Sequence, residues 1–403
     1  MMAPLENGQT YYQGPDWRLR HPIVVPNGKT VYVPTVHPQG DQRVLRCAQA
    51  LLDGGYGIHL IWMGGTPGSN RWAANLTETR LPAATSLLDR LRALPRLAGL
   101  AYRNDADAWH IHDFYMLPLA LMWHFLARRP VIYDVHEYYG ELYAARLPRG
   151  LQRMGRIAIE RFQGWAAARL GGANVVAPEM SPLFRLSKTS VAITPNYPII
   201  ESYGVPEGQK ASDRMRRVIH TGSLSESYGS SILVGIARAL ADQQSPIQLI
   251  VVARFASFRA KVEFDSLLAQ AGHPSNLEVI PPVPVHDIPA LLSTCGVGLS
   301  TLQDVGQNGR AVPTKLYEYT LMGLAILASD LQAQRTFVVQ HAVGRLVPAD
   351  SIQSYVNALE TLVEDARNVS SAAKKAALQA QHTLNWEKAC APALRSLARG
   401  IIR

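Results

Sequence analysis

Short apolar runs alternate with longer stretches of helical periodicity along most of the chain. Residues 30–36 (TVYVPTV) are typical of a strand, residues 41–53 (DQRVLRCAQALLD) of a helix that begins at Asp41, and residues 57–62 (GIHLIW) of a second strand. An aspartate before the helix and two glycines after it are ordinary start and stop signals. The pattern therefore predicts a β-α-β unit.

The alternation continues on both sides of a polar segment rich in proline and glycine, at 194–217. Further strands are predicted at 108–111, 131–135, 174–177, 190–193, 217–221, 247–252, 277–280, 296–300 and 325–329, with helices at 229–241, 256–270 and from about 351 onwards. Near-continuous apolar strands joined by helices form parallel sheets that are covered on both faces. We therefore expect two doubly wound α/β domains. Ligands of such sheets bind beyond the carboxyl ends of the strands, where a site is expected.

Composition narrows the choice of partners. The 403 residues are 47% hydrophobic, and 40 Lys and Arg against 31 Asp and Glu give a net charge of +9. This balance favours anionic partners such as nucleotide phosphates or acidic lipids, although a basic protein without a special partner agrees with it equally. The basic residues are scattered and form no recognition motif, so no nucleic-acid partner is expected.

Cysteine usage and hydropathy indicate the compartment. The three cysteines are far apart, and they predict neither a disulfide framework nor a structural zinc site. The N-terminus shows no signal-peptide pattern, and no apolar run reaches the ~18 residues of a spanning helix. We expect a cytoplasmic protein, either soluble or peripheral on the inner face of the membrane.

One stretch, 87–103 (LLDRLRALPRLAGLAYR), is both basic and apolar. It is compatible with docking on an acidic membrane that carries a lipid-linked acceptor. The favoured alternative is an ordinary packing helix with snorkelling arginines, because Pro95 interrupts the stretch.

Most familiar catalytic motifs are absent. The glycines at 54–57 follow a helix and precede a strand, which is the reverse of a dinucleotide-binding loop. Asp105 and Asp107 lie in a helix-to-strand turn, where solvated aspartates are commoner than a metal site. No P-loop, GxSxG or HExxH sequence occurs. Hydrolase and metalloenzyme functions therefore have little support, and no metal is expected.

The most informative segment is 308–330, NGRAVPTKLYEYTLMGLAILASD. Pro313 suits the first position of a helix, whose exposed amides form an anion site. Glu318 falls in the second turn, where its two oxygens can accept both hydroxyls of a ribose. The alternative is that Glu318 pairs with Lys315 on the same helix face. Spacing alone leaves the two readings even.

PTKLYEYTLMGLAILASD resembles the C-terminal-domain signature of the family 4 retaining glycosyltransferases, which have the GT-B fold. Other segments are similar to that family at DQRVLRCAQALLDGGYGIHLI, DADAWHIHDFYMLPLALMWHFLARRPVIYDVHEYYGE, TPNYP, VIHTGSLSESYG and LNWEKACAPAL. The resemblance implies two Rossmann-like doubly wound parallel-sheet domains that face each other across a cleft. The N-terminal domain would comprise 1–198, with a helix at about 384–403 crossing back onto it. The donor domain would comprise 199–383.

The resemblance also assigns roles to individual residues. Glu318 would hold the donor ribose, and the donor diphosphate would lie near the amides of 311–314. The donor-binding set it implies is Glu318, Gly222, Ser223, Arg310, Lys315, Pro313, Thr314 and Arg254. His136, in YDVHEYY, would be the catalytic residue that faces the transferred sugar, with Asp134 and Glu137 beside it. The alternative for His136 is a histidine satisfied by neighbouring backbone.

On the acceptor side, the resemblance points to the loop at 36–41 and to residues at strand ends. Gly40 would allow close approach of the backbone, and Asp41, His112, Asp113 and Glu137 complete the expected acceptor and cleft residues. Structural roles for His112 and Asp113 are equally open.

The chain also departs from the family pattern. The first of two glutamates that the family commonly has is Arg310 here, and Ser223 and Tyr228 stand where basic residues are common. Arg310, Arg254 or Lys315 would then supply the charge that holds the diphosphate.

The resemblance implies a retaining, metal-independent hexosyl- or N-acetylhexosaminyl-transferase. The donor would be a nucleoside-diphosphate sugar, with UDP or GDP as the expected nucleotide and no separate cofactor. The acceptor would be a hydroxyl of a glycan, a lipid-linked molecule or a small molecule. The alternatives are a non-catalytic glycosyltransferase-like partner subunit and a sugar-nucleotide 2-epimerase of the same fold.

Overall fold

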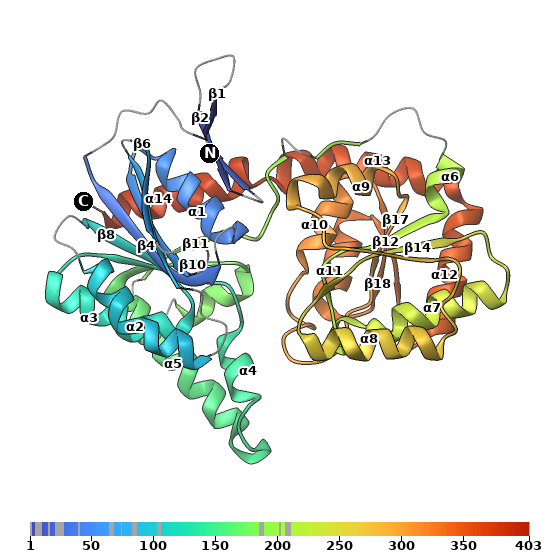
Figure 1. Cartoon of the computed structure of the whole chain (residues 1–403), viewed down its shortest axis with the longest axis horizontal. Coiled ribbons are helices and arrows are strands. Elements are labelled where there is room, and N and C mark those ends of the chain that lie inside the picture. Colours follow the sequence, from blue (N-terminus) through green and yellow to red (C-terminus); the bar gives the residue numbers. More distant parts are fainter. Residues whose placement is uncertain are drawn as a thin grey trace. The chain divides into compact units, whose positions relative to one another are not determined.

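The computed structural model describes residues 2–4, 10–14, 17–20, 28–38, 41–63, 68–73, 75–82, 87–102, 106–184, 189–200, 203–205 and 211–402. The chain divides into two compact units (Figure 1). The first comprises Met1–Asn196 and Trp386–Arg403, and the second comprises Tyr197–Asn385. These limits lie two residues from the domain boundaries placed from the sequence. Gly40, one of the predicted acceptor residues, is outside the described residues.

The first unit is built on an eight-stranded sheet in the order β11-β10-β9-β8-β4-β5-β7-β6. All neighbouring strands are parallel except β6, which pairs antiparallel with β7. Its strands are β4 (Thr30–Pro38), β5 (Gly57–Met63), β6 (Gly68–Ala73), β7 (Leu76–Leu81), β8 (Ala108–His112), β9 (Val131–Val135), β10 (Gly171–Val175) and β11 (Ser190–Ile193). A small antiparallel sheet precedes it, formed by β1 (Met2–Pro4), β2 (Thr10–Gly14) and β3 (Trp17–Arg20).

Helices cover this sheet because each buries one apolar face. The helices are α1 (Gln42–Leu52), α2 (Leu87–Ala101), α3 (Leu117–Ala127), α4 (Tyr139–Ala144), α5 (Gln152–Leu170) and α14 (Ala391–Ile401). Residues of α2, α3 and α5 share one core with alternate residues of β8 and β9, around Trp109, Trp123 and Tyr133. Helix α14 returns from the end of the chain to pack against α1, β10 and β11.

The second unit is a six-stranded parallel sheet in the order β16-β14-β12-β17-β18-β19. Its strands are β12 (Arg217–His220), β14 (Gln248–Val252), β16 (Leu277–Ile280), β17 (Val297–Ser300), β18 (Ala325–Ser329) and β19 (Gly344–Val347). Its helices are α6 (Ala211–Met215), α7 (Ser230–Asp242), α8 (Phe258–Gln270), α9 (Ile288–Ser293), α10 (Thr314–Leu321), α11 (Gln332–His341), α12 (Ile352–Glu364) and α13 (Ala366–Thr383).

Side chains of successive strand residues enter two separate cores, one on each face of this sheet. Val218 joins the core covered by α7, α8 and α12, and Ile219 joins the core covered by α9, α10, α11 and α13. Gly298 of β17 faces the second core, where a Cβ would lie 2.2 Å from the ring of Tyr319. The glycine therefore lets α10 lie directly on the sheet.

The predicted alternation of strands and helices is confirmed, with local differences. The strand predicted at 174–177 is β10, which begins earlier, at Gly171. The prediction missed this start because the two leading glycines are not residues that favour strands. Strands β6 and β19 lie at sheet edges and contain polar residues or glycine, so the apolar pattern missed them. The polar segment at 194–217 contains the short helix α6.

The basic and apolar stretch at 87–103 forms α2, which continues through Pro95. Leu97 is fully buried, and Ala93 and Leu94 pack against the core of the first unit. These contacts are those of a packing helix, the alternative favoured by the sequence. Among the described residues, no helix combines the length and apolar character needed to span a membrane.

Candidate functional site

Polar side chains gather where β8 and β9 of the first unit end. These strands pair in parallel, and their register places His112 opposite Asp134, while His136 follows β9 directly. Nδ1 of His112 lies 2.8 Å from Nε2 of His136, and the same two nitrogens lie 3.3 and 3.4 Å from Oδ2 of Asp134. Asp134 and His112 are fully buried, whereas the His136 side chain is 11% exposed. His136 is therefore the member of this group that a ligand can reach.

Asp134 stays ionised because a buried cation compensates it. Nε and Nη2 of Arg43 donate to its two oxygens at 3.1 and 2.8 Å, and Asn174 donates to Oδ1 at 3.2 Å. Burial opposes ionisation, but the charge of Arg43 and that of His136 outweigh it and hold the pKa of Asp134 well below its usual range. Despite its own burial, Arg43 has a raised pKa, chiefly because of Asp134.

Arg43 connects parts of the first unit that are distant in the sequence. Its guanidinium donates to the carbonyl and hydroxyl oxygens of Thr194 and to Oδ1 of Asn196. Its Cζ lies 5.5 Å from the ring centroid of Trp386, which follows the second unit in the chain. Sequence reasoning missed Arg43. It lies four residues before Cys47 on the buried face of α1, and an arginine in that pattern is the signal that identifies it.

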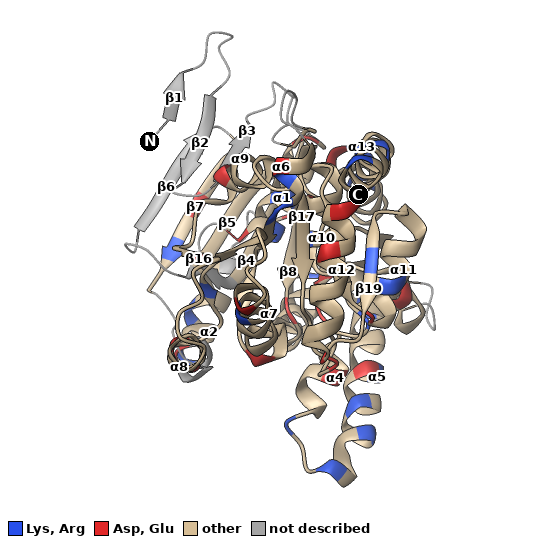
Figure 2. Ribbon diagram, turned by 90° about the vertical axis from the view of Figure 1, so that its right-hand side faces the viewer, with Lys and Arg blue, Asp and Glu red and all other residues tan. Residues whose placement is uncertain are grey.

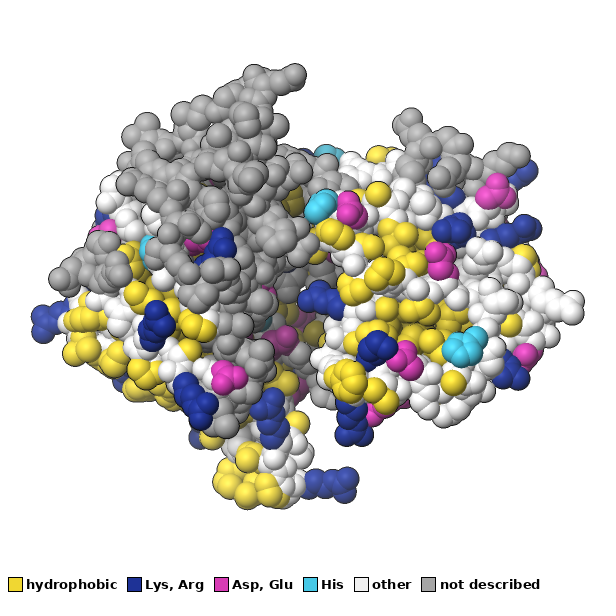
Figure 3. Space-filling model, in the orientation of Figure 1, with side chains coloured by type: hydrophobic (Ala, Val, Ile, Leu, Met, Phe, Trp, Pro, Cys, Tyr) yellow, Lys and Arg dark blue, Asp and Glu magenta, His cyan; other side chains and the backbone are white. Residues whose placement is uncertain are grey.

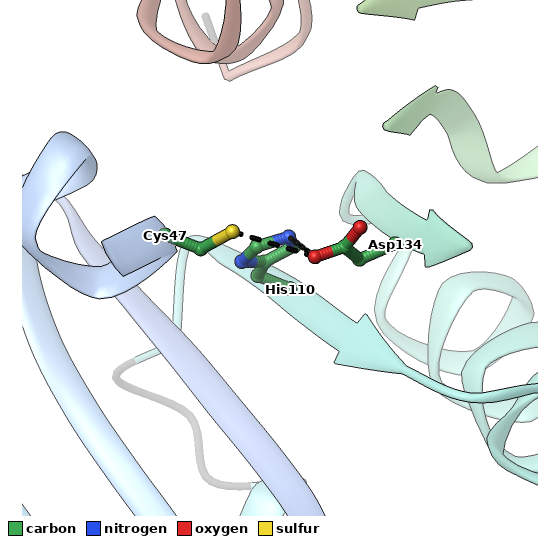
Figure 4. A group of neighbouring side chains, drawn as sticks. All are labelled: Cys47, His110 and Asp134. Atoms are coloured by element: carbon green, nitrogen blue, oxygen red, sulfur yellow. Dashed lines mark hydrogen bonds and ion pairs between the residues drawn. The ribbon is translucent and has the colours of Figure 1, made fainter. Parts of the chain in front are cut away.

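His112, Asp134 and His136 are close enough to form one group of possible metal ligands, and a second group, Cys47, His110 and Asp134, is packed beside it (Figure 4). Cys47 donates to Oδ2 of Asp134 at 3.4 Å, and Nε2 of His110 lies 3.8 Å from the same oxygen. Burial lowers the pKa of His110 to about 4, and neither ring nitrogen has a hydrogen-bond partner within the described part of the chain. Burial also raises the pKa of the Cys47 thiol. A neutral imidazole, a protonated thiol and a carboxylate already paired with Arg43 form a site that needs no cation for charge balance.

The remaining acceptor-side residues hold the neighbouring loops. Asp113 directly follows β8 with φ of 76°, a conformation uncommon outside glycine, and it accepts hydrogen bonds from Tyr115 and Tyr139 at 2.8 and 2.7 Å. Glu137 is half-buried beside His136. Asp41 accepts from two backbone amides as the N-cap of α1. The structure thus brings His112, Asp113, His136 and Glu137 together at adjacent strand ends, and it gives Asp41 a capping contact.

In the second unit, a glycine turn follows β12. Gly222 has φ of 100°, and a Cβ there would lie 3.3 Å from Cε of Lys315. The next residue, Ser223, begins β13 (Ser223–Leu224), whose register pairs it with Arg254 in β15 (Arg254–Phe255). Four residues of the predicted donor set, Gly222, Ser223, Arg254 and Lys315, therefore surround one turn.

Lys315 is buried here without a carboxylate at hydrogen-bond distance from its amine in the described structure. Its side chain is 7% exposed, and Nζ lies 3.2 Å from Nε2 of His220. Burial lowers the pKa of Lys315 to about 7, against a smaller opposing effect of Glu318. Burial, and then the charge of Lys315, hold the pKa of His220 well below its usual value. A buried, half-titrated amine beside a glycine turn is the electrostatic setting that an anionic ligand would complete.

Glu318 is half-buried on α10 and accepts a hydrogen bond from the hydroxyl of Tyr203 at 3.2 Å. Pro313 is the N-cap residue of α10, with an extended ψ of 139°, and the helix begins at Thr314. This corrects the prediction that Pro313 occupies the first helical position. Arg310 is exposed in the loop that precedes α10, and Tyr228 ends a short 3-10 turn before α7.

The chain matches two family models. Residues 40–187 match the glycosyl transferase 4-like domain, and residues 215–365 match glycosyl transferases group 1, so the two models together account for well over half of the chain. No curated protein matches the sequence.

Several solved structures have the same fold. Sucrose-phosphate synthase from Thermosynechococcus elongatus has a TM-score of 0.69 at 15% identity, covering 92% of this chain and 98% of that one. HepE of Anabaena, in complex with UDP and glucose, has a TM-score of 0.64 at 17% identity, covering 92% and 98%. An α,α-trehalose-phosphate synthase (UDP-forming) from Burkholderia vietnamiensis has 0.63 at 14%, covering 93% and 99%. These likenesses show the GT-B fold, as the sequence predicts.

We expect Asp134→Asn to lower the free energy of unfolding of the first unit by about 3–5 kcal/mol at neutral pH, because it leaves the buried Arg43 without its counter-charge. Urea unfolding followed by circular dichroism measures this. The pKa of Asp134 is depressed in the folded state, so its ionised carboxylate contributes fully to stability above the ordinary value of 3.8. This contribution is lost as the pH falls below that value. The difference in unfolding free energy between the wild type and Asp134→Asn should therefore narrow in acid.

The matched control is Asp89→Asn, at a partly exposed aspartate on α2 of the same unit, which should change stability by less than about 0.5 kcal/mol. Similar losses in the two variants would contradict the role given to the Arg43–Asp134 pair.

Proposed function

We propose that this chain, which belongs to the group 1 glycosyltransferases and has their GT-B fold, transfers a sugar from a nucleoside-diphosphate donor to an acceptor hydroxyl. The transfer would retain the configuration of the sugar and would need no metal. Membership in the family makes the chain a glycosyltransferase. Beyond this, we propose the nucleotide, the stereochemistry of the transfer, its independence from metal and the roles of individual residues.

The observation that carries the proposal is the buried amine of Lys315 against Gly222. A diphosphate placed over this turn would meet the Lys315 ammonium and the hydroxyl of Ser223, and Arg254, whose backbone pairs with Ser223 across β13 and β15, would extend its guanidinium to it. These groups would replace the basic residues that the family pattern commonly has near Ser223 and Tyr228. Arg254 suits this role because a guanidinium binds phosphate oxygens in a bidentate manner.

Glu318 would bind the donor ribose from the same helix. It lies one turn after Lys315 on α10, so a ligand that spans both would carry its phosphates at the start of the helix and its ribose one turn further on. The hydroxyl of Tyr203 fixes the Glu318 carboxylate at 3.2 Å. HepE, a structural neighbour, was solved with UDP and glucose, and the synthase from Burkholderia is UDP-forming, which supports UDP before GDP as the nucleotide.

His136 would orient the transferred sugar. Its partner His112 and the ionised Asp134 fix the imidazole from behind, so that the ring keeps its direction without help from solvent. Retention would follow if the leaving diphosphate accepts the proton of the attacking hydroxyl on the same face of the sugar. The protein would then contribute by positioning the reactants and by stabilising negative charge on the leaving group.

The same charges support the proposed independence from metal. Where many phosphate-transferring sites use a divalent cation, Lys315 and Arg254 would neutralise the diphosphate here. In the first unit, the charge of Asp134 is already balanced by Arg43. Donor binding and turnover should therefore be equal in the presence of a chelator and of added Mg²⁺.

A thermal-shift screen of UDP, GDP, ADP, CMP and dTDP tests the donor site. At 100 times its dissociation constant, one nucleotide should stabilise the wild type by about 2.7 kcal/mol, and Glu318→Ala should lose most of this shift because the ribose hydroxyls lose their acceptor. Glu364→Ala, at an exposed glutamate of α12, is the control and should keep the shift. Failure of all five nucleotides to stabilise the wild type would overturn the donor site and favour a non-catalytic partner subunit.

Binding of the nucleotide should also take up a proton above neutral pH. The pKa of Lys315 is about 7 in the ligand-free protein, and a diphosphate would raise it, so affinity should fall by up to about tenfold per pH unit above 7. Calorimetry at pH ~8 in buffers of different ionisation enthalpy measures the uptake. Lys315→Met should abolish it, and Lys375→Met, on the exposed face of α13, should not. Uptake unchanged in Lys315→Met would assign the proton to another group.

His136→Ala should lower kcat by about 100-fold, because the sugar loses its positioning contact, while donor affinity changes by less than about twofold. Release of nucleoside diphosphate from the donor measures the first, and calorimetry measures the second. His286→Ala, at an exposed histidine of the second unit, serves as control. A turnover unchanged in His136→Ala would show that His136 has only a structural role.

A further inference from the structure

A helical hairpin in the first unit carries exposed apolar residues at its end. Helices α4 and α5 pack against each other and are joined by residues 145–151, and Figure 1 shows this end extending away from the sheet of the unit. No residue from 145 to 154 is buried. The exposed apolar side chains are Leu142, Leu147, Leu151 and Met154, with exposures of 37, 39, 45 and 64%. Single exposed leucines are ordinary, but four at one end of a hairpin mark a surface that contacts something apolar.

The outward face of α5 continues this surface. Met154, Ile157 and Ala158 line an open groove of about 460 Å³, flanked by Arg153 and Arg161. Their spacing of three and four residues places them along one face of the helix. A different face of the helix holds Ile159 and Phe162, which pack against the core of the unit. Helix α5 is therefore apolar on two faces near this end, although only one of them is needed for the fold.

Arginines surround the apolar residues. The segment 142–161 contains five arginines and one glutamate, a net charge of +4 out of +9 for the whole chain. Arg156 lies within 4.0 Å of Glu141 and Glu160, and Arg146 stacks over Tyr143. The other three, Arg149, Arg153 and Arg161, form no ion pair with any described residue. Figure 2 shows the basic positions along the lower part of α5, and Figure 3 shows hydrophobic and basic side chains side by side at the end of the hairpin.

The geometry points to an anionic membrane surface as the partner of this hairpin. Arginine can bury its aliphatic stem against lipid chains and keep the guanidinium at the level of the lipid phosphates, while leucine and methionine enter the acyl boundary. A second copy of the chain is disfavoured, because its hairpin would bring the same positive charge against this one. The stretch at 87–103 is a poorer candidate, since Leu97 and its neighbours are committed to the core.

Co-sedimentation with vesicles tests this inference. The full chain should bind vesicles of phosphatidylcholine with about one third phosphatidylglycerol, should not bind phosphatidylcholine alone, and should bind less as salt is raised. Arg149→Glu/Arg153→Glu should lower the ratio of bound to free protein at least about tenfold. Arg92→Glu/Arg96→Glu changes the charge by the same amount at exposed positions of α2 and should lower it less than about twofold.

A third variant separates insertion from electrostatic attraction. Leu151→Ser/Met154→Ser keeps the charge, and it should weaken the binding that remains at high salt, because burial of apolar side chains is not screened. All three variants should keep the melting temperature of the wild type, since their side chains are exposed.

Absence of binding to anionic vesicles, or equal losses in the two charge-reversed variants, would overturn the inference. A lipid-free dimer that Leu151→Ser/Met154→Ser abolishes would overturn it in favour of a second copy of the chain. The inference is independent of the proposed donor site, because none of these variants changes a residue of that proposed site.

Discussion

The buried ion pair between Arg43 and Asp134 is the constraint on which the first unit depends. It joins α1 to β9, and through Arg43 it also holds the end of β11 and the segment that returns from the second unit. Two full charges without water are stable only when they are paired and their own oxygens and N–H groups are hydrogen-bonded. Asn174, Thr194 and Asn196 meet this demand, and His112 and His136 lie on the remaining side of the carboxylate. The direction of the exposed imidazole is thus set by a network that solvent does not reach.

In the second unit, a buried basic group lacks a counter-charge at hydrogen-bond distance among the described residues. Lys315 lies in a comparably dry place, but its amine faces a neutral imidazole and a glycine turn. Burial therefore lowers the pKa of this amine to about 7, so that it gains or loses its proton near neutral pH. One unit therefore holds a finished electrostatic network, and the other holds an unfinished one that a ligand can complete. The two units therefore differ in how their buried charges are compensated.

The fold could be predicted from the hydrophobic pattern because parallel strands that are covered on both faces are continuously apolar. Strands β8, β9 and β18 are of this kind and are buried at every residue. The helix-start signal at Pro313 likewise located the region of α10, whereas the turn at Gly222 was indicated by the resemblance to the family. What could not be predicted is where a charged side chain enters a core. Arg43 and Arg46 both lie on the buried face of α1, and the hydrogen-bond partners of Arg43 come from positions up to 153 residues away. The exposed hairpin could not be predicted either, because the sequence alone does not distinguish the apolar residues of 142–161 from residues that lie in a core.

The return of the last helix also determines which unit can complete its fold first. Trp386 and α14 belong to the first unit, yet the ribosome completes the whole second unit before it reaches them. The second unit is one continuous stretch and can fold as it emerges, in the way that domains generally do during synthesis. During that time the nascent first unit has every strand of its β-sheet but lacks the aromatic cover of Arg43 and the helix over β10 and β11. The half of the protein that is translated first is consequently the half that matures last.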